Sequence, residues 1–204
     1  MLLPAAASQA ADGGWQVWNR GSISGRIAEG WAVRIGEEFR FADGEKELYY
    51  HLTSIDITYQ ITPWLSVGPG YAQLYSYSGA AWMGENRPMV NGNLSWAGGL
   101  LGVSDRSRFE YRIREGAQDI WRYRNLLKLS STRTWTRLAL QPYISNEFFV
   151  VLNGSEWNAN RLYAGIRLRP FTFLTADIFY LRQSKKTSAW TGYNVIGSAL
   201  SFSF

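Results

Sequence analysis

Residues 104–130, SDRSRFEYRIREGAQDIWRYRNLLKLS, sort their side chains by alternate positions. Five charged residues share one parity in the first arm: Arg106, Arg108, Glu110, Arg112 and Arg114. Aromatic and aliphatic residues fill the positions between them. After a polar bend, the second arm repeats the pattern with Arg122, Arg124 and Lys128. A period of two is the mark of a strand with two different faces. The stretch therefore predicts a β-hairpin with one cationic and one apolar side.

The composition of the whole chain narrows the fold class. The 204 residues, which suit a single domain, include ten Trp, twelve Tyr and twenty Gly, while charged residues make up only 18%. Mean hydropathy is nevertheless slightly negative at -0.21. No run of about 18 uninterrupted apolar residues is present, so a helical membrane protein is excluded. Two classes remain, a soluble β-sandwich and a β-barrel in which polar positions dilute the apolar ones.

Residue types that are scarce remove several kinds of chemistry. The chain has no Cys, so a disulfide, a thiolate nucleophile and a Cys-based metal site are all excluded. Its single His excludes a His-rich metal cluster, and we expect neither a metal nor a cofactor. The net charge of +5 would suit nucleic acid, but the arginines alternate along strands and form no basic run or helix. We therefore expect no nucleic-acid partner.

The first residues resemble the end of a secretory signal peptide. MLLPAAASQAADGG combines a short apolar segment with small residues, and Ser8-Gln9-Ala10 has the small-x-small pattern of a cleavage site. We expect an exported protein in which residues 1–12 are a signal-peptide remnant or a disordered start, and residues 13–204 form the barrel.

From Trp15 onward the chain divides into strand-like segments of about 10 to 13 residues, a length that suits tilted strands crossing a bilayer. The segments are 15–27, 31–41, 48–61, 64–77, 86–96, 101–114, 120–130, 138–151, 160–169, 173–183 and 193–204. Short connections at 28–30, 62–63, 97–99 and 170–172 alternate with longer ones at 42–47, 78–85, 152–159 and 184–192. Outer-membrane barrels show this asymmetry, with short periplasmic turns and longer external loops.

Tryptophans lie mostly near the two ends of these segments, as in the aromatic girdles of membrane barrels. The expected girdle is Trp15, Trp31, Trp64, Trp96, Trp121, Trp135 and Phe204. The alternative is that Trp caps the core of a soluble barrel. Between the bands one face of the segments is apolar, and the other carries charges whose burial in a dry core would be costly. The expected lumen charge network is Arg34, Glu38, Arg87, Arg106, Arg108, Glu110, Arg112, Arg114, Arg122, Arg124, Glu147, Arg161, Arg167 and Asp177.

We therefore predict an all-β fold, a single antiparallel transmembrane β-barrel of 10–12 strands. The count stays open because eleven segments are visible whereas bacterial single-chain barrels have even numbers. Either the first segment bends at 19–21 and is not a full wall strand, or the start of the chain threads the lumen.

Several short motifs carry a resemblance to a known family. They are WQVW at 15–18, EEFRF at 37–41, ELYYH at 47–51, ENRP at 85–88, SRFEYR at 107–112, WRYR at 121–124, QPY at 141–143, NRLYAG at 160–165 and YNV at 193–195. With them the chain resembles a family of small bacterial outer-membrane β-barrel proteins of unknown function. The resemblance implies the fold and an outer-membrane location in a Gram-negative bacterium. It supplies no catalytic or ligand residues.

Three functional hypotheses follow. The first is a narrow channel or binder for small anions or acidic oligosaccharides, because guanidinium groups suit carboxylates and phosphates. Its counterpart is a lumen plugged by locked ion pairs. The second is a structural barrel that acts through its external loops, with Lys185 and Lys186 facing lipopolysaccharide. The third, less favoured, is a lipid acyl hydrolase using His51, for which Thr53 and not Ser54 has the right parity. His51 is more simply an interfacial residue.

Phe204, on an amphipathic last segment, resembles the signal read by the barrel-assembly machinery. The oligomeric state stays open.

Overall fold

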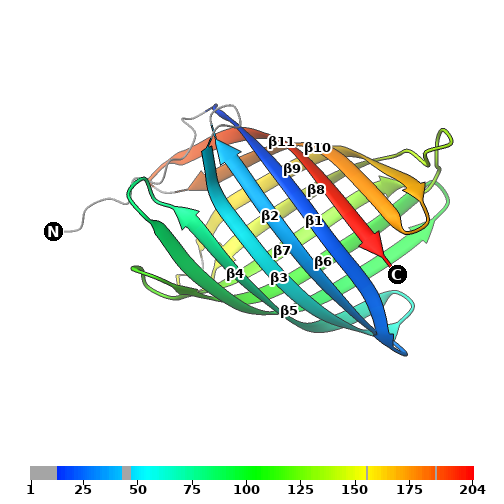
Figure 1. Cartoon of the computed structure of the whole chain (residues 1–204), viewed down its shortest axis with the longest axis horizontal. Helices are drawn as coiled ribbons and strands as arrows, with labels where there is room; N and C mark the ends of the chain where they lie inside the picture. Colours follow the sequence, from blue (N-terminus) through cyan, green and yellow to red (C-terminus); the bar gives the residue numbers. More distant parts are fainter. Residues whose placement is uncertain (1–12, 43–46, 155, 187) are drawn as a thin grey trace.

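A computed structural model describes residues 13–42, 47–154, 156–186 and 188–204 as a closed β-barrel whose strands are strongly tilted (Figure 1). The strands are β1 (Trp15–Ala28), β2 (Trp31–Ala42), β3 (Glu47–Thr62), β4 (Leu65–Tyr77), β5 (Trp82–Gly98), β6 (Leu101–Arg114), β7 (Ile120–Ser131), β8 (Gln141–Val151), β9 (Glu156–Phe171), β10 (Leu174–Lys186) and β11 (Trp190–Ser203). In the described part of the chain, no helix is long and apolar enough to span a membrane.

Each strand pairs antiparallel with the next in sequence, and the barrel closes by a parallel pairing of β1 with β11. That seam runs from Trp15 opposite Asn194 to Ser24 opposite Ser203. With an odd number of alternating strands, the first and last must run in the same direction. The number of strands, eleven, lies within the predicted range of 10–12. The first segment is a full wall strand, since β1 pairs with β2 continuously from Gln16 to Arg26, and the expected bend at 19–21 is absent.

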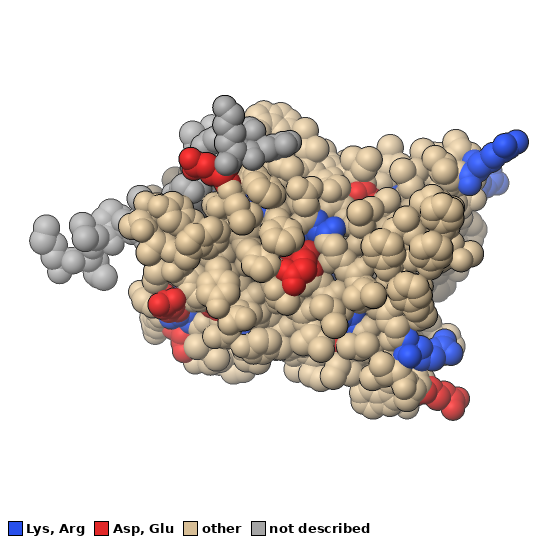
Figure 2. Space-filling model, viewed as in Figure 1, with Lys and Arg blue, Asp and Glu red and all other residues tan. Residues whose placement is uncertain are grey.

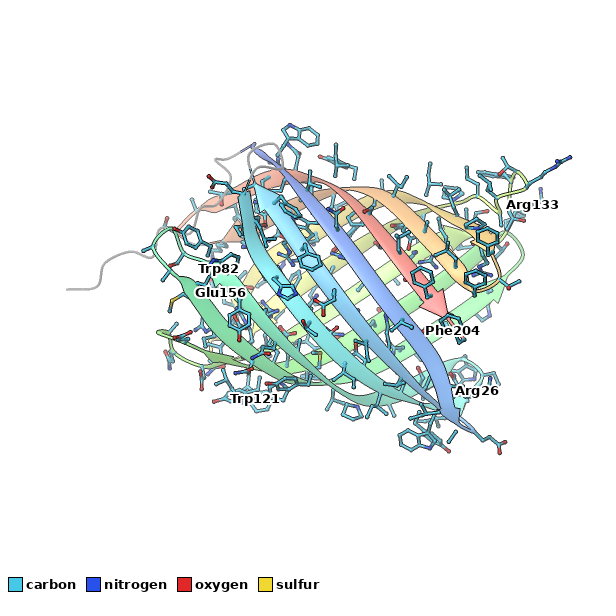
Figure 3. All side chains as sticks on the ribbon, viewed as in Figure 1. Arg26, Trp82, Trp121, Arg133, Glu156 and Phe204 are labelled. Atoms are coloured by element: carbon cyan, nitrogen blue, oxygen red, sulfur yellow. The ribbon has the colours of Figure 1, made fainter. Side chains whose placement is uncertain are left out.

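The two ends of the barrel differ in their connections. At one end, the short-turn end, two residues join β1 to β2, β3 to β4, β5 to β6 and β9 to β10. At the other, the loop end, strands are joined by three to five residues. These loops are shorter than the sequence suggests because the strands extend outward; β5, for example, begins at Trp82 and not at Asn86. Figure 3 places Arg26, Arg133 and Phe204 at the short-turn end and Trp82 and Glu156 at the loop end.

One connection at the short-turn end departs from the expected pattern. Nine residues, 132–140, separate β7 from β8, and within them Trp135 and Leu140 form an isolated bridge. Thr136 and Ala139 have φ values of 68° and 50°, so the segment turns back on itself. The expected strand beginning at Leu138 therefore begins at Gln141. Leu138 and Leu140 alternate like strand residues but belong to this small turn.

The outer wall is mostly apolar. Ile23, Ile55, Val90, Ile144 and Ile178 are each more than two-fifths exposed. Uncharged residues cover most of the wall visible in Figure 2, with charged ones mainly at the two ends and one small group near the centre. A closed barrel pairs every strand edge, the condition under which strands are stable in a bilayer. This distribution of apolar and charged residues is the opposite of that in a water-soluble domain.

Aromatic and aliphatic side chains fill one side of the interior. The cluster consists of Trp18 from β1 and Tyr143, Tyr163, Phe179, Leu181, Tyr193 and Val195 from β8 to β11. Gly197 makes room for it, because a Cβ there would meet the ring of Phe179. The remaining interior, lined largely by β2 to β9, carries the charged residues.

Candidate functional site: the charged barrel interior

The interior holds a cavity of about 1080 Å³. Its lining runs from Tyr77, Met83 and Ala117 near the loop end to Lys128 and Ser201 nearer the short-turn end. Twelve arginines and three lysines line it, against eight acidic residues. One of the eight, Glu37, has the parity of the outer wall, since its neighbour Glu38 binds the interior arginines. The cavity is therefore a cationic space.

Glu147 is the most heavily bound carboxylate. It is 1% exposed and lies on β8, where alternation turns it inward between Asn146 and Phe148. Arg124 of β7 donates to it at 2.7 Å, and Arg106 of β6 and Arg161 of β9 each donate at 3.2 Å. Four neighbouring strands are thus joined through one carboxylate.

Glu110 extends this network toward β6. The side chain is fully buried and accepts hydrogen bonds from Arg122 and from Arg124, the latter at 3.3 Å. Arg124 therefore bridges Glu110 and Glu147. The aromatic ring of Phe149 lies 4.8 Å from the guanidinium carbons of both Arg124 and Arg161, which adds a cation–π contact on one side.

A second group is centred on Trp18, whose indole is completely buried. The Arg40 guanidinium lies 3.7 Å from the Trp18 ring centroid and also binds Glu38. Arg20 binds the other oxygen of Glu38 at 2.9 Å. The Trp18 indole N–H donates to Gln16 at 3.0 Å, so this large ring has its one polar group satisfied.

Other charged residues pair within one strand or between two neighbouring strands. Glu85 accepts from Arg112 at 2.5 and 2.7 Å and from Arg87 at 2.6 Å. Arg167 and Asp177 form a bidentate pair, with both N–O distances 2.9 Å. Such two-pronged geometry is the strong form of the ion pair.

Four cations that line the cavity have no carboxylate within 4 Å among the described residues. Arg34 donates to the hydroxyl of Ser22 at 3.0 Å, and Arg114 donates to the backbone carbonyl of Gln118. The amines of Lys128 and Lys185 lie over the rings of Tyr143 and Tyr193, at 3.5 and 6.0 Å. These four residues, Arg34, Arg114, Lys128 and Lys185, are referred to below as the unmatched cations.

The fourteen residues that the sequence suggested for the lumen all line this cavity: Arg34, Glu38, Arg87, Arg106, Arg108, Glu110, Arg112, Arg114, Arg122, Arg124, Glu147, Arg161, Arg167 and Asp177. The set left out Arg20, Arg40, Glu85 and Asp56, which share the inward parity of their strands. It also left out Trp18, whose place inside the first segment was its only signal. The suggested girdle residues are all exposed, from 41% for Trp31 to 76% for Phe204.

A closed barrel with an apolar outer wall and a charged interior that holds a cavity is a fold of the outer-membrane type. Within this class the chain belongs to the family described as "Protein of unknown function (DUF2490)", whose model matches residues 15–194. A search of curated protein sequences found no match.

Two solved structures share the fold. "KdgM porin in complex with disordered oligogalacturonate" is 16% identical, with 90% of each chain covered and a TM-score of 0.50. "LpxR from Salmonella typhimurium" is 8% identical, with 85% of this chain and 83% of that chain covered and a TM-score of 0.51. At these identities the likeness concerns the fold alone.

Proposed function

We propose that this protein is a narrow channel of the bacterial outer membrane that favours small anionic solutes. The observation that carries the proposal is the excess of guanidinium and ammonium groups around the cavity, including the four unmatched cations. A cationic cleft with low-dielectric walls concentrates anions and raises their rate of entry.

The solute class follows from the kind of cation. Guanidinium groups bind carboxylates and phosphates with matched, two-pronged hydrogen bonds. The KdgM porin structure, by its title, was solved with an oligogalacturonate, an acidic saccharide. A string of carboxylates spaced along a sugar chain would meet successive cations of this lumen, from Lys185 near the loop end to Lys128 nearer the short-turn end. Acidic oligosaccharides are therefore the solutes we propose first.

The exposed apolar wall supports the proposed location. Exposed Ile, Leu and Val residues between two aromatic bands suit the acyl region of a bilayer, and Trp and Tyr suit its borders. Lys186 at the loop end, 40% exposed, suits the anionic headgroups of lipopolysaccharide.

We further propose that the terminal Phe204 is read by the barrel-assembly machinery. Phe204→Ser should then lower the fraction of folded barrel in the membrane, without affecting barrel refolded in detergent.

The competing function is a closed structural barrel whose ion pairs plug the lumen. The networks around Glu147 and Glu110 favour it, because buried pairs of this kind are rigid and costly to rearrange. The cavity beside them favours a channel. Conductance of the folded barrel distinguishes the two.

The test is single-channel recording in planar bilayers under a KCl gradient. We expect discrete currents with a reversal potential that shows anion preference. Arg34→Gln with Lys128→Gln should reduce that preference, since neither side chain pairs with a carboxylate. Arg133→Gln, which removes an exposed cation that does not line the cavity, is the matched control and should change little. Absence of current from a barrel that shifts on heating in a detergent gel would favour the plugged barrel.

Solute choice is tested by current block. An oligogalacturonate added on the loop side should interrupt the current at lower concentration than a neutral oligosaccharide of the same length. Equal block by both sugars would contradict the proposed preference for acidic solutes. The difference should shrink in the Arg34→Gln, Lys128→Gln variant.

A further inference from the structure

Polar residues with outward parity form a row across β2 to β5, beside Gly21 of β1. Cross-strand pairing places Gly21 of β1 opposite Glu37 of β2, Glu37 opposite Thr53 of β3, Thr53 opposite Gln73 of β4, and Gln73 opposite Asn86 of β5. All have outward parity, since the residues next to them in each strand line the cavity. We call this the outer polar row.

The row lies at a border of the apolar wall. Two residues along each strand toward the short-turn end come Ile23, Ile35 and Ile55, which are 50%, 46% and 41% exposed. Two residues toward the loop end come Phe39 and Tyr75, both about two-fifths exposed. A lipid lying along this wall would place its acyl chains against the isoleucines. Its ester linkages, which separate acyl chains from headgroup, would lie at the row.

His51, the only histidine of the chain, is joined to this row. Its Nε2 lies 2.6 Å from Oε2 of Glu37, and the two side chains are 36% and 38% exposed. Phe39 stacks on the imidazole, with ring centroids 4.7 Å apart and planes 6° from parallel. The ring orientation is therefore held from two directions. In the neutral imidazole with Nε2–H donating to Glu37, the lone pair is on Nδ1.

Thr53 supplies a hydroxyl on the same face of the sheet as this pair. It follows His51 by two positions on the same face of β3 and is the direct partner of Glu37, toward which the imidazole reaches. Among the described residues the Thr53 hydroxyl makes no hydrogen bond, and the residue is exposed. On its other side, Gln73 uses one amide N–H to donate to the Tyr75 hydroxyl at 3.1 Å. The second N–H of that amide is a donor for an oxyanion.

We propose that Glu37, His51 and Thr53 form a lipid-facing catalytic site that cleaves acyl esters of membrane amphiphiles. A hydroxyl nucleophile, a base and a carboxylate that orients the base are the parts of an acyl-transfer site, recognised by roles and not by fold. Thr53 and His51 are the catalytic residues, and Glu37 is a positioning residue. The site shares no side chain with the unmatched cations, so it is independent of the proposed channel.

The reaction balances with water as the second substrate. The Thr53 oxygen bonds to the ester carbonyl carbon while its proton moves to Nδ1 of His51. The carbon–oxygen bond to the alcohol then breaks, and His51 returns the proton to the departing alkoxide. Water then attacks the threonyl ester and gives a proton to His51. The bond between the Thr53 oxygen and the acyl carbon breaks, His51 returns the proton to the Thr53 oxygen, and the fatty acid is released. Gln73 donates to the carbonyl oxygen in both steps.

The experiment uses the folded full chain and two sources of acyl ester. Detergent micelles containing dipalmitoyl phosphatidylethanolamine form one arm, and purified lipopolysaccharide forms the other. Mass spectrometry measures released fatty acid. A second readout is covalent labelling by hexadecanesulfonyl fluoride, followed by mapping of the modified peptide. We expect release from at least one source, which identifies the substrate, and an adduct on Thr53.

Variants assign the roles. His51→Ala should lower the rate by about 10²- to 10⁴-fold. Thr53→Val should abolish both release and labelling, whereas Thr53→Ser should keep both. Glu37→Gln should lower kcat by about 10²-fold or more while KM stays unchanged. Ser107→Ala is the matched control, because Ser107 is an outer-wall hydroxyl bonded to Tyr123 with no histidine beside it. Its rate should equal that of the wild type.

Three results would overturn the assignment. The first is that a barrel shown to be folded by its gel shift releases no fatty acid from either source and forms no adduct. The second is an adduct on a residue other than Thr53. The third is undiminished release of fatty acid by Thr53→Val. Channel conductance should be the same in wild type and Thr53→Val, so failure of the hydrolase leaves the channel proposal standing, and failure of the channel leaves the hydrolase standing.

Discussion

Replacement of Glu147 by glutamine should be among the most destabilising single changes in this barrel. The variant keeps the shape of the side chain and one acceptor oxygen but removes the negative charge that Arg106, Arg124 and Arg161 share. Three guanidinium groups would then face one another around a neutral amide that is 1% exposed in the wild type.

The magnitude follows from the geometry. At an N–O distance near 3 Å and an effective dielectric near 20, each pair attracts by roughly 5 kcal/mol before desolvation is subtracted. Desolvation offsets much of this while the pair is intact, but not after one partner has been removed. Loss of one member of a buried pair typically costs about 3–5 kcal/mol. With three partners we expect Glu147→Gln to lie at the upper end of that range.

The assay is urea unfolding of the barrel in phospholipid vesicles, followed by tryptophan fluorescence. Glu156→Gln is the matched control, since Glu156 is 55% exposed and pairs only with Lys186 at 3.0 Å. An exposed pair contributes about 0–1 kcal/mol. If the free energies of unfolding of the two variants agree within about 1 kcal/mol, the Glu147 network does not stabilise the barrel and our reasoning is wrong.

Other predictions concern packing and topology. Trp18→Ala should lower the free energy of unfolding by about 3–5 kcal/mol in the same assay, because the indole is completely buried. Gly197→Ala should destabilise through a clash with an aromatic ring, whereas Gly92→Ala, where a Cβ meets nothing within 4 Å, should not; equal effects would contradict the packing described. In intact cells trypsin should spare the bonds after Arg133 and Arg137 at the short-turn end, and permeabilising the outer membrane should expose them. Cleavage in intact cells would contradict an orientation in which the short-turn end faces the periplasm.

Much of the architecture could be predicted from alternation alone. Inward charged residues at every second position, as in 106–114, require a polar interior, and from this the barrel follows. Leu138 misled the prediction because two alternating leucines inside a turn look like the start of a strand. The parallel closure of β1 on β11 could not be seen, since it depends on the number of strands and on no local pattern.

The pairing of individual charges could not be predicted from the sequence, for a different reason. Parity tells which face a residue takes, but partners across strands depend on register. A bulge between Arg40 and Phe41 shifts β2 against β3. On the Glu37 side of this bulge, the register places Glu37 diagonally across from His51. Thr53 had the right parity in the sequence. Its carboxylate neighbour became visible only when the two strands were aligned.

The seam between β1 and β11 also constrains the order of events during assembly. Each of the other pairs can form as a hairpin between consecutive segments, but the seam joins residues separated by almost the entire chain, as in Gln16 opposite Val195. Closing so long a loop is slow, and it must wait until the last strand is in place. Until then β1 and β10 present open edges that can pair with other chains. We therefore expect the nascent protein to depend on a chaperone that shields these edges until closure.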